Sequence, residues 1–401
     1  MDINGVCEPA FSEVEAAFRD NFSRGGELGA SVHVTVEGQT VVDLWAGDAA
    51  PGKPWEADTV SVVFSCTKAA VALAAHLLID RGELELDAPM SRYWPEFAQN
   101  GKAGATVRMA LDHAVGVPAL RDPVAPGGFF DWDQMVDDLA RTKPFWEPGT
   151  RNGYHMITFG WVIGELIRRV SGKGLGEFFA QEIANPLNLD FWIGLPDSVE
   201  TRVAPVQFPS RRDAPTTEFT QAIVDDRGSI QALAWLNSGG YLEDVDAPAA
   251  HRAQIGGAGG IANARALARM FAPLANDGRH GQTQFIGERA ITRMSTTSVA
   301  THQDATLLLP TKFALGFMKS MDNRARPNGA IESVILGQNA FGHVGAGGSL
   351  GFADPDARLS FGYTMNQMGH GILLNQRGQT LVDATYRAMG YTDNSAGCWV
   401  K

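Results

Sequence analysis

The chain has 401 residues, and its 33 lysine and arginine residues against 45 aspartate and glutamate residues give a formal net charge of −12. Apolar residues make up 44% and charged residues 19%, which is the balance of a globular protein with enough chain for one or two domains. Because the balance is acidic and basic residues form no cluster, nucleic acid and an anionic membrane surface are excluded as main partners.

The sequence also bears on compartment and cofactors. No apolar run approaches the roughly 20 residues that span a bilayer, and the acidic N-terminus lacks the basic and apolar segments of a signal peptide. The three cysteines are scattered, which favours reduced thiols over a disulfide framework. The histidines lack metal-binding spacings such as His-Glu-x-x-His. We therefore expect a cytoplasmic protein that needs neither a metal nor another cofactor.

Taken in chain order, the predicted strands lie near both ends and the predicted helices mostly between them. Alternating runs predict a hairpin over 30–36 and 40–45 and a second over 350–353 and 359–365. Apolar spacing predicts helices over 10–24, 66–81, 159–170, 264–276 and 378–389, and residues 322–338 are expected to form a surface loop.

This order of elements predicts an α/β fold with an antiparallel sheet built from both chain ends and flanked by helices. On this prediction, residues 1–64 and 305–401 form the sheet domain. Residues 65–304 form an inserted, mainly helical domain, and the active site lies in the cleft between the two.

The strongest local motif is Ser65-Cys66-Thr67-Lys68, at the start of the helix predicted over 66–81. Residues three apart lie on one face of a helix, so the hydroxyl of Ser65 and the amine of Lys68 can approach each other. A serine becomes a strong nucleophile only when a base takes its proton, and a lysine serves as that base only when its pKa is depressed. The alternative is that Ser65 merely caps the helix.

Three further segments accompany this motif. Leu111-Asp112-His113-Ala114-Val115-Gly116-Val117-Pro118 reads as a helix end that runs into a turn, and Tyr154 lies on a loop that enters the helix predicted over 159–170. Residues 341–349 are rich in glycine just before a predicted strand, so their backbone can pass close to a ligand.

In this order and spacing, the four segments resemble the serine β-lactamase/penicillin-binding protein superfamily, and within it the family VIII carboxylesterases, which are similar to class C β-lactamases. The resemblance runs from about residue 10 to residue 390. The second segment departs from the family's LLxHxxGLP pattern at Ala110 and Val117.

The resemblance implies a β-lactamase-like fold and a set of site residues. Ser65 would be the acylated nucleophile, and Lys68 and Tyr154 together would act as its general base. The backbone N–H groups of Ser65 and Ala346 would form the oxyanion hole. Substrate-binding residues are then expected at His343, Gly345, Asn152 and His155.

Two departures from the lactamase pattern favour an ester over a β-lactam as substrate. His343-Val344-Gly345 stands where lactamases carry Lys-Thr-Gly, and Tyr154-His155-Met156 stands where they carry Tyr-Ser-Asn. The contacts for the carboxylate and the acylamino group of a β-lactam are therefore missing, whereas a neutral ester needs neither. We expect a small-molecule ester of short chain length as the substrate, and the sequence leaves a homo-oligomer open.

Several alternatives remain at this point. The same site could serve an acyltransferase, an amidase or a weak β-lactamase, and a protein of another class, a penicillin-recognising binding protein with a lapsed site, is also consistent. Gly347-Gly348-Ser349-Leu350-Gly351 matches the G-x-S-x-G pattern, but a strand rather than a helix is predicted after it, which argues against an α/β-hydrolase elbow.

Overall fold

The computed structural model describes residues 2–210, 212 and 214–401. Its main element is a seven-stranded antiparallel sheet in the order β1-β3-β2-β14-β13-β12, with β4 paired to β3. Both predicted hairpins are present, and strands from the two chain ends meet where β2 pairs with β14. The strands are β1 (Ile3–Cys7), β2 (Gly29–Val36), β3 (Gln39–Ala50), β4 (Lys53–Pro54), β12 (Phe341–Val344), β13 (Leu350–Asp354) and β14 (Leu359–Met365).

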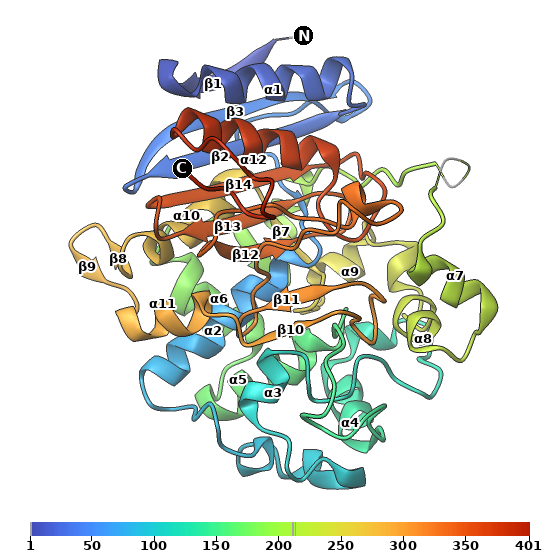
Figure 1. The fold of residues 1–401 in the computed structure, drawn as a ribbon. Helices are drawn as coiled ribbons and strands as arrows, with labels where there is room; N and C mark the ends of the chain where they lie inside the picture. Colours follow the sequence, from blue (N-terminus) through green and yellow to red (C-terminus); the bar gives the residue numbers. More distant parts are fainter. Residues whose placement is uncertain (1, 211, 213) are drawn as a thin grey trace.

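Helices cover both faces of this sheet. The terminal helices α1 (Ser12–Ser23) and α12 (Gln376–Ala388) pack together on one face, and α10 (Ala264–Ala275) packs on β2, β13 and β14 (Figure 1). Asn263 caps α10 by accepting the Ala266 N–H, as the sequence suggests. Because α10 lies within 65–304 yet belongs to the sheet layer, the predicted domain boundary does not follow the packing.

The remaining elements lie mostly below the sheet in Figure 1. They include a small sheet in the order β5-β7-β6. The helices α2, α5 and α6 pack on one another. The helices are α2 (Cys66–Asp80), α3 (Val107–Leu111), α4 (Trp132–Arg141), α5 (Phe159–Ser171), α6 (Leu175–Phe179), α7 (Glu218–Asp225), α8 (Ile230–Leu236), α9 (Pro248–Arg252) and α11 (Glu288–Ser295). The short strands are β5 (Ser61–Val62), β6 (Phe191–Ile193), β7 (Gly260–Ala262), β8 (Arg279–His280), β9 (Thr283–Gln284), β10 (Val299–Thr301) and β11 (Thr311–Phe313).

The central helix of the molecule is α2. Every residue from Cys66 to Leu78 is buried, which explains why the helix is apolar on all sides rather than amphipathic. A polar group at the start of this helix therefore lies in the protein interior, and its chemistry is set by the few groups that surround it.

Two sequence expectations differ from the structure. The segment 322–338 is only partly a surface loop, because Val334, Ile335 and Leu336 are buried in the core. The strand β1, which the sequence analysis did not predict, pairs with β3 at the sheet edge. Among the described residues, none of the helices has the length and apolar composition to cross a bilayer.

Candidate active site

Ser65 lies at the junction between the small sheet and α2. The preceding residue, Phe64, has a φ of 44°, a left-handed conformation that is strained for a residue with a side chain. Ser65 occupies the N-cap position, but its side chain makes no capping hydrogen bond. The alternative that Ser65 serves as a helix cap is therefore wrong, and its hydroxyl is left for another partner.

That partner is Lys68, whose Nζ lies 2.9 Å from Ser65 Oγ. Nζ also donates to the backbone carbonyls of Met156 at 2.5 Å and Gly257 at 2.6 Å. All three partners are uncharged, and Lys68 is fully buried. Burial holds the pKa of Lys68 well below its usual value. When the amine is neutral, its two N–H groups donate to these two carbonyls, and its lone pair is left to accept a proton from the Ser65 hydroxyl.

Tyr154 approaches the pair from the loop before α5. Its ring centroid lies 4.8 Å from Lys68 Nζ, and the ring stacks on Phe313. Its hydroxyl makes no hydrogen bond of good geometry with any described residue. Burial raises the pKa of the Tyr154 phenol, while the nearby Ser65 opposes the rise. The side chain is therefore a neutral phenol at ordinary pH.

The position of Tyr154 is fixed by Asp304, a residue that the sequence analysis missed. Both carboxylate oxygens of Asp304 accept the Tyr154 N–H, at 2.9 and 3.0 Å. The same carboxylate accepts from the backbone N–H groups of Thr306 and Leu307, and Asp304 is completely buried. Asp304 lies in a loop 150 residues from Tyr154, so no local motif could have revealed the contact.

The glycine-rich turn after β12 lies against the segment that precedes Ser65. Ser349 Oγ donates to the carbonyl of Val63 at 3.1 Å, and the N–H of Gly345 donates to the Ser349 carbonyl. A Cβ on Gly345 would lie 2.1 Å from Ser349 Oγ and 2.3 Å from the Val63 oxygen, so only glycine fits. These contacts hold Ala346 beside Ser65. Within the described turns and loops, neither the Ser65 nor the Ala346 N–H donates to another backbone or side-chain group.

The contacts of Ser349 also show whether the G-x-S-x-G pattern at 347–351 marks a nucleophile. The side chain is buried, its hydroxyl is bonded to Val63, and β13 follows it directly. The pattern therefore marks a close approach of two segments rather than a nucleophile.

His343 lies on β12 with its ring 6.0 Å from that of Tyr154. Nδ1 bonds the carbonyl of Val344 at 2.7 Å, which leaves Nε2 as a buried acceptor with no hydrogen bond to the described residues. Burial lowers the pKa of His343 to about 3. This side chain is neutral where lactamases carry a lysine.

The other two side chains expected to bind substrate, His155 and Asn152, are hydrogen-bonded to neighbouring loops. Both ring nitrogens of His155 are engaged, by the Val117 N–H at 3.0 Å and the Gly153 carbonyl at 2.8 Å. The expectation that His155 contacts substrate is therefore wrong, and its contacts give it a loop-positioning role. Asn152 donates to the Asp112 carbonyl at 2.6 Å, while its Oδ1 has no partner among the described residues.

A small cavity of about 40 Å³ opens at Ser65. Of the expected site residues, Ser65, Tyr154 and Ala346 line it, whereas Lys68 and His343 lie behind the surface. The rest of the lining is apolar: Phe64, Met156, Ile157, Phe208, Trp235, Leu242, Ala258, Met368 and Ile372.

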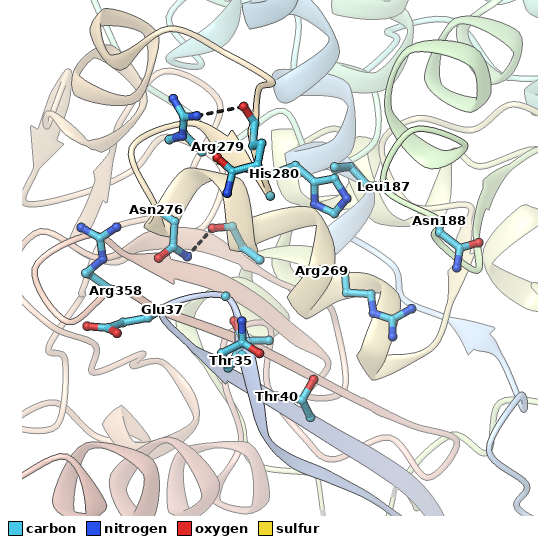
Figure 2. Close-up of a pocket in the computed structure, with 15 residues that line it drawn as sticks. Thr35, Glu37, Thr40, Leu187, Asn188, Arg269, Asn276, Arg279, His280 and Arg358 are labelled. Atoms are coloured by element: carbon cyan, nitrogen blue, oxygen red, sulfur yellow. Dashed lines mark hydrogen bonds between the residues drawn. The ribbon is translucent and has the colours of Figure 1, made fainter.

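A second cavity, of about 690 Å³, lies elsewhere, between the β2–β3 turn, the end of α10 and the β8–β9 hairpin (Figure 2). Arg269, Arg279 and Arg358 line it, but Arg358 pairs with Asp277 and Arg279 bonds Gln284. None of the predicted site residues lines this cavity, so it is separate from the candidate active site.

Together, the sheet flanked by helices and the buried serine–lysine pair at the start of α2 are the features of a β-lactamase-like serine hydrolase fold. Comparisons with known proteins agree. The Beta-lactamase family model matches residues 14–380. The esterase/beta-lactamase LipL of Mycobacterium tuberculosis is 35% identical over 91% of this chain and 83% of its own length.

Two solved structures are similar along nearly the whole chain. A family VIII carboxylesterase is 36% identical with a TM-score of 0.85, and a penicillin-binding protein homologue from Caulobacter crescentus is 35% identical with a TM-score of 0.84. Each similarity covers 97% of this chain and 100% of the other. This chain belongs to the beta-lactamase family and is a serine hydrolase with the β-lactamase-like fold.

Proposed function

We propose that this protein hydrolyses carboxylic esters through an acyl-enzyme on Ser65. The observation that carries the proposal is the 2.9 Å approach of a fully buried Lys68, whose pKa burial holds well below its usual value, to Ser65 Oγ. A lysine in this state accepts a proton from the serine hydroxyl, which is the activation that a serine nucleophile requires. The similarity to carboxylesterases along the whole chain supports the same reaction class.

In the first half of the reaction, Ser65 Oγ attacks the ester carbonyl carbon while its proton passes to Lys68 Nζ. The carbonyl oxygen becomes negatively charged and accepts hydrogen bonds from the N–H groups of Ser65 and Ala346. When the bond to the alcohol oxygen breaks, that oxygen takes a proton from the Tyr154 phenol, which is replenished from Lys68. Because burial raises the pKa of Tyr154, the phenol acts as a proton donor and relay, and Lys68 as the base.

In the second half, a water attacks the acyl carbon and gives its proton to Lys68. The bond from carbon to Ser65 Oγ then breaks, Oγ regains a proton, and the carboxylic acid leaves. Each half needs one base, one relay and one oxyanion hole, so the proposed set is complete without a further group.

The choice of an ester over a β-lactam rests on the neutral His343. A β-lactam carries a carboxylate, and a buried neutral imidazole does not neutralise it. An unpaired buried contact costs about 1–3 kcal/mol, so β-lactam turnover should be about 5- to 150-fold slower than ester turnover. Acyl transfer and amide hydrolysis use the same acyl-enzyme and differ only in the nucleophile or the leaving group.

The test compares p-nitrophenyl butyrate with a chromogenic cephalosporin on one preparation, using wild type and Ser65→Ala. We expect ester hydrolysis that exceeds cephalosporin hydrolysis at least about fivefold and that is lost in Ser65→Ala. Full ester activity in Ser65→Ala would contradict the nucleophile. Faster cephalosporin than ester turnover would contradict the substrate class, and no turnover of either substrate would favour a lapsed binding protein.

A further inference from the structure

The small cavity at Ser65 adjoins a larger chamber of about 290 Å³. The two cavities share five lining residues, so the chamber begins where the small cavity ends. Ala346, whose N–H belongs to the proposed oxyanion hole, lies at this boundary. The shared residues are Phe208, Trp235, Ala346, Met368 and Ile372.

The walls of the chamber are mainly apolar. Phe219 and Ile223 contribute from α7, Trp235 from α8, and Leu307 and Leu309 from the loop after Asp304. The described lining residues include one carboxylate, Glu332, and neither lysine nor arginine. An apolar group gains free energy on entering such a space, whereas an anionic group would lose its hydration against mainly apolar walls.

The position of Tyr154 indicates which part of an ester enters the chamber. Ser65 and Tyr154 line the small cavity but not the chamber. The alcohol oxygen must lie near Tyr154 to receive a proton when it leaves. The acyl chain, which extends from the carbon bonded to Ser65, is then directed past Ala346, away from Tyr154.

On the basis of the proposed esterase function, we infer that this chamber is an acyl-chain subsite that makes the enzyme selective for uncharged esters of medium acyl length. A volume of about 290 Å³ corresponds to roughly ten groups of the size of a water molecule. Octanoyl and phenylalkanoyl groups therefore fit, which extends the acyl range beyond the short chains expected from the motifs.

Each methylene that is fully buried in the chamber should raise kcat/KM up to about fourfold, because burial of a methylene contributes to transition-state binding without taking part in the chemistry. The rise should end when the chamber is full. We therefore expect kcat/KM for p-nitrophenyl octanoate to exceed that for the acetate at least tenfold, and the dodecanoate to gain nothing further.

The chain offers a matched pair of variants on α7. Ile223 is half-buried and lines the chamber, whereas the adjacent Val224 is 70% exposed and does not. Ile223→Trp should fill the chamber and lower the octanoate-to-acetate ratio at least tenfold, with acetate turnover unchanged. Val224→Trp should leave the ratio as in wild type. Trp235→Ala enlarges the space and should shift the optimum to a longer chain, which tests the same wall if Ile223→Trp folds poorly.

The outcomes separate this inference from the proposed function. An octanoate-to-acetate ratio that Ile223→Trp and Trp235→Ala both leave unchanged would overturn the subsite while ester hydrolysis stands. If Ile223→Trp lowered kcat/KM for octyl acetate but not for octanoate esters, the alcohol group would occupy the chamber and the acyl assignment would be overturned. Absence of any Ser65-dependent ester hydrolysis would instead remove the proposed function itself.

Discussion

The amine of Lys68 lies 2.9 Å from the hydroxyl of Ser65 and is held there by two backbone carbonyls, those of Met156 and Gly257. The carbonyls belong to segments far apart in the chain, before α5 and before β7. They orient the amine but carry no negative charge to stabilise an ammonium ion. Burial lowers the pKa of Lys68 and so favours the uncharged amine. This arrangement makes a base of a side chain that is a cation in water.

Replacement of Lys68 tests its proposed role as the base. Lys68→Met keeps most of the side-chain volume but removes the amine, so kcat/KM for p-nitrophenyl butyrate should fall about 10³-fold, within the range of general-base contributions. Lys102 provides a matched control, because it is also buried and donates only to backbone carbonyls, three of them, yet lies outside the site. A similar loss in Lys102→Met would show that general damage, not loss of the base, explains the result.

The pH profile should report the same group. Lys68 accepts a proton only as the neutral amine, so kcat/KM should rise with pH as the ammonium form disappears. Because the pKa of Lys68 is well below its usual value, the rise in kcat/KM should be complete well below the pH at which a lysine amine in water loses its proton. His343, with a pKa of about 3, stays neutral above pH 5 and adds no second step. A rise centred near pH 10.5, measured with an ester stable to base, would contradict a depressed Lys68.

Several features of the fold and of the candidate site could be predicted from the sequence, because they depend on residues that are close together in the chain. The Ser65–Lys68 spacing predicts a shared helix face, and the hairpins at 29–50 and 350–365 follow from alternating residues joined by short turns. The N-cap of α10 at Asn263 is equally local.

What the sequence could not supply depends on contacts between distant segments. Asp304 holds the Tyr154 backbone across 150 residues, and the carbonyls that orient Lys68 carry no side-chain signal. An imidazole such as that of His155 can bind a substrate, but only the fold shows that both of its ring nitrogens are hydrogen-bonded, to Val117 and Gly153. The packing of α10 on the sheet likewise reflects tertiary contacts rather than its place in the chain order.

Tyr154→Phe should separate activity from stability. The variant keeps the ring that stacks on Phe313 and removes a buried hydroxyl with no partner among the described residues. Because the ring packing is kept, Tm should stay close to that of wild type while kcat falls about 10²-fold or more.

Tyr241→Phe is the matched control for Tyr154→Phe. Tyr241 is also fully buried with an unpaired hydroxyl in the described part of the chain, but it does not line the active-site cavity. It should likewise keep a Tm close to that of wild type, with unchanged kcat. Unaltered kcat in Tyr154→Phe would remove Tyr154 from the proton relay.

Gly345→Ala tests the turn that holds Ala346. The added methyl group would meet Ser349 Oγ and the Val63 oxygen at 2.1 and 2.3 Å, so the turn must move away from Ser65. We expect a loss of about 1–3 kcal/mol in the free energy of unfolding and a fall in kcat of about 10²-fold from the displaced N–H donor. Gly104→Ala, where a Cβ meets open space, should change neither. Normal kcat in Gly345→Ala would argue against Ala346 as an oxyanion donor.

The most direct test of the account is the identity of the labelled residue after exposure to a serine-reactive phosphonate ester. Intact mass and peptide mapping should show one adduct, on Ser65, formed at a rate that falls at least 10²-fold in Lys68→Met, since the same base activates the serine toward carbon and phosphorus. An adduct on another serine such as Ser349, or labelling of Ser65 at an equal rate without Lys68, would contradict the proposed Ser65–Lys68 mechanism.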